Sequence, residues 1–223
     1  DVEEVRWSGL DRTDLDVAAE LAGVETGRSI ASVDSGAIEA RLEELPWVAD
    51  AAVSRSWSGV VSIDVTERPA VALVMKAQDQ WVMVDATGTV LSDEIAGSGL
   101  PRISGIPAAG EPGSVLGRSA SAPLVVTSLL PATLAPRLEG IARDERGEMW
   151  LTLLTADRIL LGDDTQLALK LAAVVTVLEA VDQSGRTGWE MDVSVPTLPV
   201  VRDLRPEWQD NVVVQSTPEL PIG

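Results

Sequence analysis

The chain has 223 residues and a formal net charge of −18, from 17 Lys and Arg against 35 Asp and Glu. It contains no His, Cys, Tyr or Phe, which excludes a Ser-His-Asp triad, a cysteine nucleophile, a disulfide and a metal site built on His or Cys. The acidic balance argues against nucleic acid and against an anionic membrane surface as partners, because both attract clustered Lys and Arg.

The first 72 residues predict a small α/β domain. Asp34 precedes Ile38, Leu42 and Leu45, and this apolar spacing is typical of an amphipathic helix. Two later runs alternate between apolar and polar residues, and Ser58-Gly59 between them predicts a hairpin turn. The expected elements are strands over 2–7, 51–57 and 61–65 and helices over 15–21 and 34–45.

The rest of the chain predicts a sheet of mainly antiparallel strands and one long helix near the C-terminal end, so the fold class is α+β. Asp163 or Asp164 is expected to cap that helix. We expect domains over 1–73 and 74–203 and a flexible tail over 204–223. The remaining elements are strands over 71–75, 81–84, 89–91, 138–142, 149–154, 158–161, 189–195 and 198–202, helices over 124–130 and 165–181, and a loop over 97–122.

One tetrapeptide resembles the active-site triplet of aspartic proteases: Val33-Asp34-Ser35-Gly36. That chemistry needs two carboxylates that share a proton, each from its own loop. The second loop would have to be Asp85-Ala86-Thr87-Gly88, which is one residue too long. The other interpretation, which we favour, is that Asp34 caps the helix that follows it. A carboxylate-based hydrolase centred on Asp34 is kept as the alternative function.

Two further side chains have both a structural and a functional interpretation. A buried Lys170 with a lowered pKa could act as a base or nucleophile, but we favour a stem that lies along the edge of the core. Trp57 is either a core residue or an exposed anchor for a partner. We favour the core, because Trp57 is in the same alternating register as Val53.

The strand predicted over 198–202 is expected to be the last one of its sheet, with one edge uncovered. Such an edge is either blunted against aggregation, here by Pro199, or used to receive the strand of another chain. Both interpretations remain open on the residues alone. If the edge receives a strand, we expect proline at Val200 to block it and Arg202 to meet an acidic residue of the partner.

Several segments, in order, resemble the cell-division proteins of the FtsQ/DivIB family. The part similar to that family's POTRA domain comprises Gly27-Arg28-Ser29-Ile30, Val33-Asp34, Leu45-Pro46-Trp47-Val48, 51–57 and 63–69. The part similar to its β-rich domain comprises Val84-Asp85, Leu100-Pro101, Leu160-Leu161-Gly162, Lys170-Leu171 and 192–196.

This resemblance implies a β-α-α-β-β POTRA domain followed by a β domain in a non-enzymatic divisome scaffold with no catalytic residue, metal or cofactor. It implies a single-pass protein of the cell membrane at the division septum, with this region extracytoplasmic and a transmembrane helix upstream. The chain begins with Asp1 and not with Met, so we expect such an upstream segment.

The resemblance also implies partners of the FtsB and FtsL class and a part in the control of septal peptidoglycan synthesis. In the family the last strand of the β domain pairs with the FtsB-type partner. The partner-binding residues are therefore expected to be Leu198, Pro199, Val200, Val201 and Arg202, with Trp57 as a second candidate. The excess of Arg over Lys indicates a GC-rich genome, such as that of an actinobacterium. The outer-membrane assembly class of POTRA proteins fits less well, because its POTRA repeats and barrel are missing from this sequence.

Overall fold

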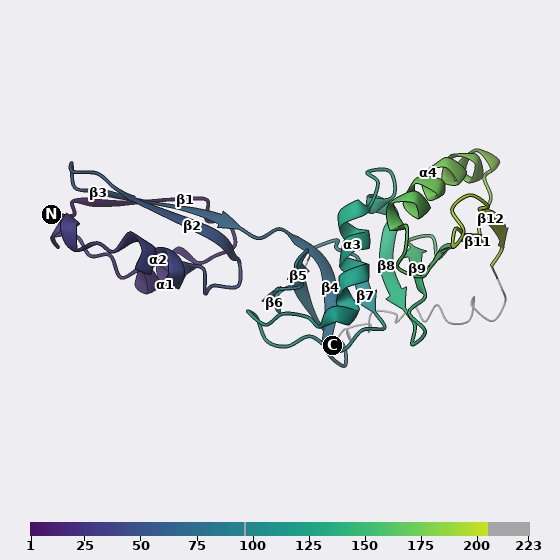
Figure 1. The fold of residues 1–223 in the computed structure, drawn as a ribbon, viewed down its shortest axis with the longest axis horizontal. Helices are drawn as coiled ribbons and strands as arrows, with labels where there is room; N and C mark the ends of the chain where they lie inside the picture. Colours follow the sequence, from purple (N-terminus) through teal and green to yellow (C-terminus); the bar gives the residue numbers. More distant parts are fainter. Residues whose placement is uncertain (96, 205–223) are drawn as a thin grey trace, which may run out of the picture. The chain divides into compact units, whose positions relative to one another are not determined.

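The computed structural model describes residues 1–95 and 97–204 of the chain. Its internal contacts define two units. The first contains residues 1–100 and 106–128, and the second contains residues 101–105 and the chain from Leu129 onward. Figure 1 labels most helices and strands of both. Of the predicted tail over 204–223, only Leu204 lies within the described residues.

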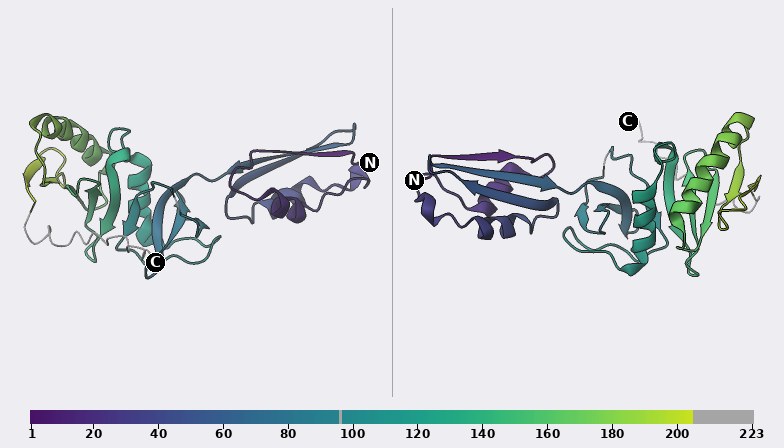
Figure 2. Two further views of the ribbon diagram at one scale, coloured as in Figure 1. Left: turned by 180° about the vertical axis from the view of Figure 1, so that it is seen from behind. Right: turned by 45° about the horizontal axis from the view of Figure 1, so that its top comes forward.

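Three strands and two helices at the start of the first unit follow the predicted order. β1 pairs with β3 in parallel and β2 pairs with β3 antiparallel, so the sheet order is β1-β3-β2. Both helices lie on the same face of this sheet in the two views of Figure 2. The elements are β1 (Glu4–Ser8), α1 (Leu15–Ala22), α2 (Ser35–Leu42), β2 (Val48–Arg55) and β3 (Val60–Glu67).

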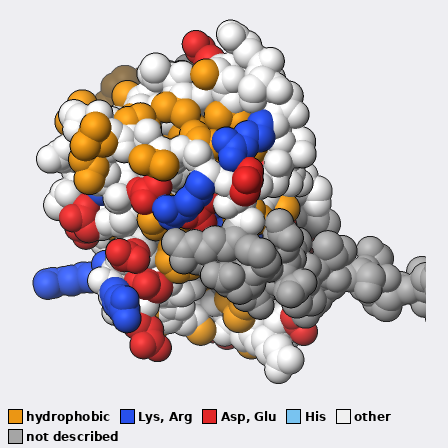
Figure 3. All heavy atoms as spheres, turned by 90° about the vertical axis from the view of Figure 1, so that its right-hand side faces the viewer, with side chains coloured by type: hydrophobic (Ala, Val, Ile, Leu, Met, Phe, Trp, Pro, Cys, Tyr) orange, Lys and Arg blue, Asp and Glu red, His pale blue; other side chains and the backbone are white. Residues whose placement is uncertain are grey.

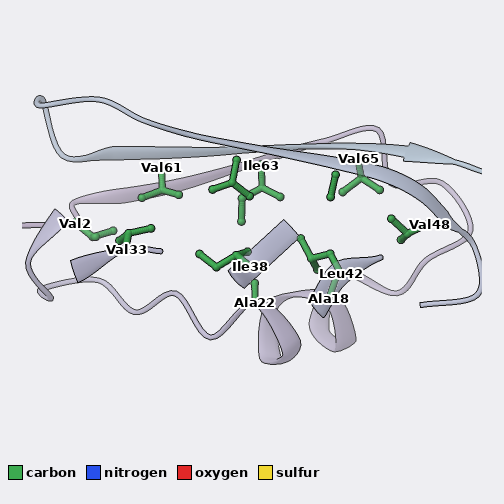
Figure 4. Packing of buried hydrophobic residues seen from close by; sticks show 12 residues of the cluster. Val2, Ala18, Ala22, Val33, Ile38, Leu42, Val48, Val61, Ile63 and Val65 are labelled. Carbon is green, nitrogen blue, oxygen red and sulfur yellow. The ribbon is translucent and has the colours of Figure 1, made fainter. Parts of the chain in front are cut away.

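Aliphatic side chains fill the space between this sheet and its helices. Val61, Ile63 and Val65 point from β3 towards the helices (Figure 4), because alternate residues of a strand share one face. They pack with Ile38 and Leu42 of α2, and all five side chains are buried. Each fully buried Val, Ile or Leu contributes about 1.5–3 kcal/mol. The first five elements therefore have a core of their own.

Three more strands of the first unit form an antiparallel meander, β4-β5-β6. Leu73, Met83 and Leu91 from these strands make a second, smaller buried cluster, and Trp47 packs against it from the segment before β2. The elements are β4 (Ala70–Ala77), β5 (Gln80–Asp85), β6 (Val90–Ser92) and the helix α3 (Ser121–Leu129).

The second unit has one sheet in the order β12-β11-β10-β9-β8-β7. Its pairs are antiparallel except for β7 with β8 and β10 with β11. Parallel neighbours need a long crossover, and α4 supplies it between β10 and β11. The elements are β7 (Arg102–Ser104), β8 (Leu138–Arg143), β9 (Met149–Leu153), β10 (Arg158–Gly162), α4 (Leu167–Ser184), β11 (Trp189–Asp192) and β12 (Val200–Asp203). The predicted α+β class is confirmed.

Strand β7 corrects the prediction of a loop over 97–122. Only Ile103 of its three residues is apolar, so the sequence contains no alternation that could reveal it. The strand ends at Ser104, and the next residue, Gly105, has a φ of 73°. A Cβ at this position would lie 1.6 Å from the carbonyl oxygen of Arg143. Glycine is therefore required where the chain leaves β7.

The start of α4 also differs from the prediction. Neither Asp163 nor Asp164 caps the helix, and its first flanking residue is Gln166, with a left-handed φ of 52° and no side-chain cap. Asp163 instead accepts hydrogen bonds from the backbone and hydroxyl of Thr165. The Asp-Asp pair resembles a capping signal, but its first carboxylate closes a turn ahead of the helix.

We predict that a fragment of residues 1–73 folds by itself, because the buried cluster between Val2 and Val65 is complete within it. The fragment lacks Met83 and Leu91 of the cluster against which Trp47 packs, so its free energy of unfolding should be lower than that of the full chain. Thermal unfolding followed by circular dichroism measures this. A fragment without a cooperative transition would show that the two predicted domains depend on a shared core.

Candidate partner-binding site

Strand β12 is the last strand of the second unit's sheet. It pairs with β11 alone, in a regular antiparallel register from Asp192↔Val200 to Trp189↔Asp203. Along its other side, no strand lies within the described residues 1–95 and 97–204. The prediction of an uncovered edge therefore falls on a real strand, which begins two residues later than expected and ends one residue later.

One hydrogen bond fixes which backbone groups of β12 face this open side. Leu204 donates its N–H to the carbonyl oxygen of Gly188 at 2.8 Å. This pair follows directly after Asp203 and Trp189 in the register. In an antiparallel ladder, hydrogen-bonded and non-hydrogen-bonded pairs alternate. The even-numbered residues of β12 therefore bond to β11, and the odd-numbered residues direct their N–H and C=O groups away from it.

The open edge consists of two residues, Val201 and Asp203. Each presents one N–H donor and one carbonyl acceptor to the side opposite β11. Pro199 stands at the next outward position but has no N–H to donate. Pro199 thus shortens the available edge without closing it. Asp203 was missed by the sequence analysis, since only the register reveals its outward backbone.

The same geometry corrects the expected effect of proline at Val200. The N–H of Val200 lies on the β11 side, because Val200 and Asp192 form a hydrogen-bonded pair. Proline there would break a bond within the sheet and leave both outward donors in place. The substitution that removes an edge donor is Val201→Pro.

Exposed apolar side chains accompany the edge. Leu198 is 72% exposed and Val200 52% exposed, and Val195 in the preceding loop is exposed as well. Leu198 lies in a turn closed by its own N–H, which bonds to the carbonyl of Val195 at 3.0 Å. Figure 3 faces the side on which α4 and β12 lie in Figure 1, and hydrophobic side chains reach the surface there between charged ones. Apolar groups beside an unpaired edge favour protein contact.

Arg202 is already paired within the protein. Its Nε donates to Oε1 of Glu190 at 2.8 Å, across the β11–β12 ladder. Glu190 is 1% exposed, and its Oε2 has no hydrogen-bond partner. The guanidinium therefore neutralises a buried carboxylate before any partner arrives. A contact between Arg202 and an acidic residue of the partner stays a prediction. That residue would compete with Glu190 for the guanidinium.

The preference for Trp57 as a core residue was wrong. Its side chain is 93% exposed. β2 ends at Arg55, and the N–H of Gly59 bonds to the carbonyl of Ser56 to close the hairpin. The alternation that linked Trp57 to Val53 stops where this turn begins. Trp57 is therefore exposed, and its role as an anchor for a partner stays a prediction.

Asp34 caps α2, as favoured. Its Oδ1 accepts the backbone N–H of Ala37 at 3.1 Å. A surface hollow adjoins it, and the carboxylates lining that hollow are Asp34 and Glu25. The side chain therefore has a complete structural role at the start of α2.

Asp85, the second residue of the protease hypothesis, also has a structural role. Its carboxylate is buried, accepts the N–H groups of Thr87 and Thr89 at 2.9 and 2.8 Å, and receives Arg68 at 3.1 Å. Burial raises the pKa of Asp85, but these hydrogen bonds outweigh it and hold the pKa below its usual value. Arg68 in turn bonds to the carbonyl of Val48. This carboxylate holds a turn and anchors Arg68.

Lys170 is buried in α4, and its amine makes two hydrogen bonds to one residue. The Nζ donates to the backbone carbonyl and to Oδ1 of Asp163, at 2.9 and 2.6 Å. These bonds and those from Thr165 lower the pKa of Asp163 to about 2. The lysine thus ties the loop after β10 to the first turn of α4. The structure agrees better with a structural lysine at the edge of the core than with a nucleophile. The whole side chain is buried, however, and not only its stem.

Neither a metal centre nor a membrane span is found in the described part of the chain. Within residues 1–95 and 97–204, no three His, Cys, Asp or Glu side chains gather in a way that could hold an ion. The helices of the same ranges are all too short or too polar to cross a bilayer.

Comparison with known proteins identifies the family. Residues 1–68 match the model of the POTRA domain, FtsQ-type, and residues 72–205 match that of the cell division protein FtsQ/DivIB, C-terminal. The chain belongs to the FtsQ/DivIB family of cell division proteins. The FtsQ/DivIB resemblance, and the order of a POTRA domain before a β-rich domain, are confirmed. The family is one of division-related membrane proteins that act as scaffolds, and the hydrolase centred on Asp34 finds no support.

Individual FtsQ proteins are similar over nearly the whole chain. A cell division protein FtsQ of Streptomyces griseus is 32% identical over 209 residues, which cover 90% of this chain and 96% of that protein. FtsQ of Corynebacterium glutamicum is 24% identical over 90% of this chain and 86% of its own length. The solved extracytoplasmic domain of DivIB from Geobacillus stearothermophilus matches 53% of this chain and 97% of that one, with 16% identity and a TM-score of 0.37.

We predict that Asp34→Asn leaves the stability almost unchanged, because asparagine caps a helix about as well as aspartate. Asp34→Ala should lower the free energy of unfolding by about 1 kcal/mol, since the N–H of Ala37 loses its acceptor. Denaturant unfolding of the two variants checks this. A peptidase activity of the wild type that disappeared in Asp34→Asn would contradict the structural role.

A second prediction concerns pH and Asp163. Its pKa is lowered to about 2 in the folded protein, from an ordinary value of 3.8. The folded state therefore gains stability from the ionised carboxylate above its ordinary pKa, and loses it as the pH falls from about 4 towards 2. Lys170→Met removes the first cause of the shift, so its stability should fall less steeply over this range. Chemical unfolding at a series of pH values measures both slopes. Parallel curves would disprove the role of Lys170.

Proposed function

We propose that this chain is the extracytoplasmic part of a single-pass membrane protein at the division septum, where it acts as a non-enzymatic scaffold of the divisome. Membership of the FtsQ/DivIB family supports this. The side chains that sequence patterns suggested as catalytic also support it. Asp34, Asp85 and Lys170 each have a structural partner. The transmembrane helix would lie upstream of Asp1.

The scaffold binds an FtsB/FtsL-type partner by adding the partner's strand to the outer edge of β12. The observation that carries this proposal is the outward direction of the N–H and C=O groups of Val201 and Asp203. An added strand would make up to four backbone hydrogen bonds with these two residues. The exposed side chains of Leu198 and Val200 would lie beside it and add apolar contact.

The two faces of the sheet set what such a strand must carry. Val201 is half-buried on the same face as the buried Met191, so the partner residues on that face should be apolar. Val200 and Arg202 lie on the opposite face, with Glu190 beside them. A partner residue there meets an ion pair that is already formed. Alternate side chains of the added strand would therefore determine its specificity.

The effect on septal peptidoglycan synthesis would follow from this binding. A scaffold without catalytic groups can act on a synthase by holding its regulators in place. We assign this task to the domain over 74–203, which carries β12, and leave the POTRA domain over 1–73 for other contacts. Arg202 and Trp57 are the side chains that remain as secondary contributors.

We predict that Val201→Pro weakens binding to the soluble region of the FtsB-type partner by about tenfold or more, because it removes one outward N–H and inserts a ring into the path of the added strand. The pairing of β12 with β11 survives, since the N–H of Val201 takes no part in it. Isothermal titration measures the affinity, and circular dichroism checks the fold.

Val201→Ala is the matched control. It trims the same side chain but keeps the N–H, so its affinity should stay much closer to that of the wild type. Equal affinities of folded Val201→Pro and wild type would disprove strand addition at this edge. Binding would then have to use another surface, for which the exposed Trp57 is the next candidate.

A further inference from the structure

The tip of the β2–β3 hairpin carries an unusual side chain. Trp57 is 93% exposed, whereas every other tryptophan within the described residues is partly or fully buried. Ile30 and Ala31 stand next to the indole and line a hollow of about 180 Å³ with it. Pockets for small molecules measure about 300–1,000 Å³, so this hollow is too small for a typical small-molecule ligand.

The tip lies at the same end of its sheet as the first residues of the chain. Glu3 donates its N–H to the carbonyl of Gly59 at 2.7 Å, and Val2 donates to the carbonyl of Arg28 at 2.7 Å. β1 and β3 run in parallel and begin together, with Glu4 opposite Val60. Figure 1 shows the N-terminus at this end of the first domain. These hydrogen bonds hold the hairpin tip close to residue 1.

Two arginines stand at this end of the domain, among carboxylates. Arg28 pairs with the exposed Glu25 at 3.8 Å, and Arg55 donates to the carbonyl oxygen of Val33 at 2.6 Å. Arg55 lines the same hollow as Trp57, so a cation and an indole share this part of the surface.

We propose that Trp57 contacts the membrane–water interface and orients the POTRA domain on the bilayer. This inference rests on the proposed function, in which a transmembrane helix anchors the chain ahead of residue 1. An indole prefers the headgroup level, where its ring is shielded and its N–H stays wet. The lipid phosphates are acceptors for Arg28 and Arg55. Because the anchor holds the tip near the bilayer, its effective concentration there is high, and a weak contact suffices.

The test tethers the full chain to vesicles of phosphatidylcholine with a nickel-chelating lipid, through a histidine tag placed ahead of residue 1. Lipids brominated close to the headgroup quench an indole that reaches the interface. We expect this quenching in the wild type and its loss in Trp57→Leu. Trp81→Phe, which removes a half-buried tryptophan, should retain it. Circular dichroism confirms that each variant is folded.

The matched control moves the tag behind Gly223, so that the same protein is tethered at the other end of its chain. The quenching that depends on Trp57 should then disappear. If the wild type tethered ahead of residue 1 shows no quenching, or if Trp57→Leu is quenched equally, the proposal is overturned. The tag supplies the anchor, so this result does not depend on the natural one, and failure of partner binding at β12 would leave it unchanged.

Discussion

The hydrogen-bond ladder between β11 and β12 determines what the last strand can offer to another chain. Backbone groups in such a ladder alternate between the two sides of a strand, and the bond from Leu204 to Gly188 fixes the phase of the alternation. Val201 and Asp203 face outward as a result, and the neighbouring Pro199 limits the edge to these two residues. A strand added there, as proposed, would be recognised by main-chain groups held by a sheet, in a chain without imidazole or thiol chemistry.

Two of the scarce positive charges neutralise buried carboxylates, and a third is itself buried beside an exposed one. Lys170 pairs with Asp163, Arg68 with the buried Asp85, and Arg202 with the buried Glu190. Breaking such a buried pair from one side is costly, because it leaves a charge without a partner.

Sequence reasoning succeeded where a periodic pattern extends over a whole element. The alternation along β3 and the spacing of Ile38 and Leu42 predicted both the elements and their buried faces. It failed where a turn interrupts the pattern, as at Trp57, and where an element is too short to have one, as in β7. The strand expected over 198–202 lies at 200–203, and its role as a partner edge stays a prediction. The direction of the N–H of Val200 could not be predicted, because it depends on the register with β11, which no local pattern encodes.

The short outward edge of β12 has a consequence for how long a complex can last. Two residues provide at most four backbone hydrogen bonds, and each contributes about 0.5–1.5 kcal/mol net. Main-chain pairing alone therefore gives about 2–6 kcal/mol, which is too little for a permanent assembly. A complex held by this pairing, as proposed, would therefore be reversible. Such reversibility would let the same scaffold molecules disengage when constriction is complete.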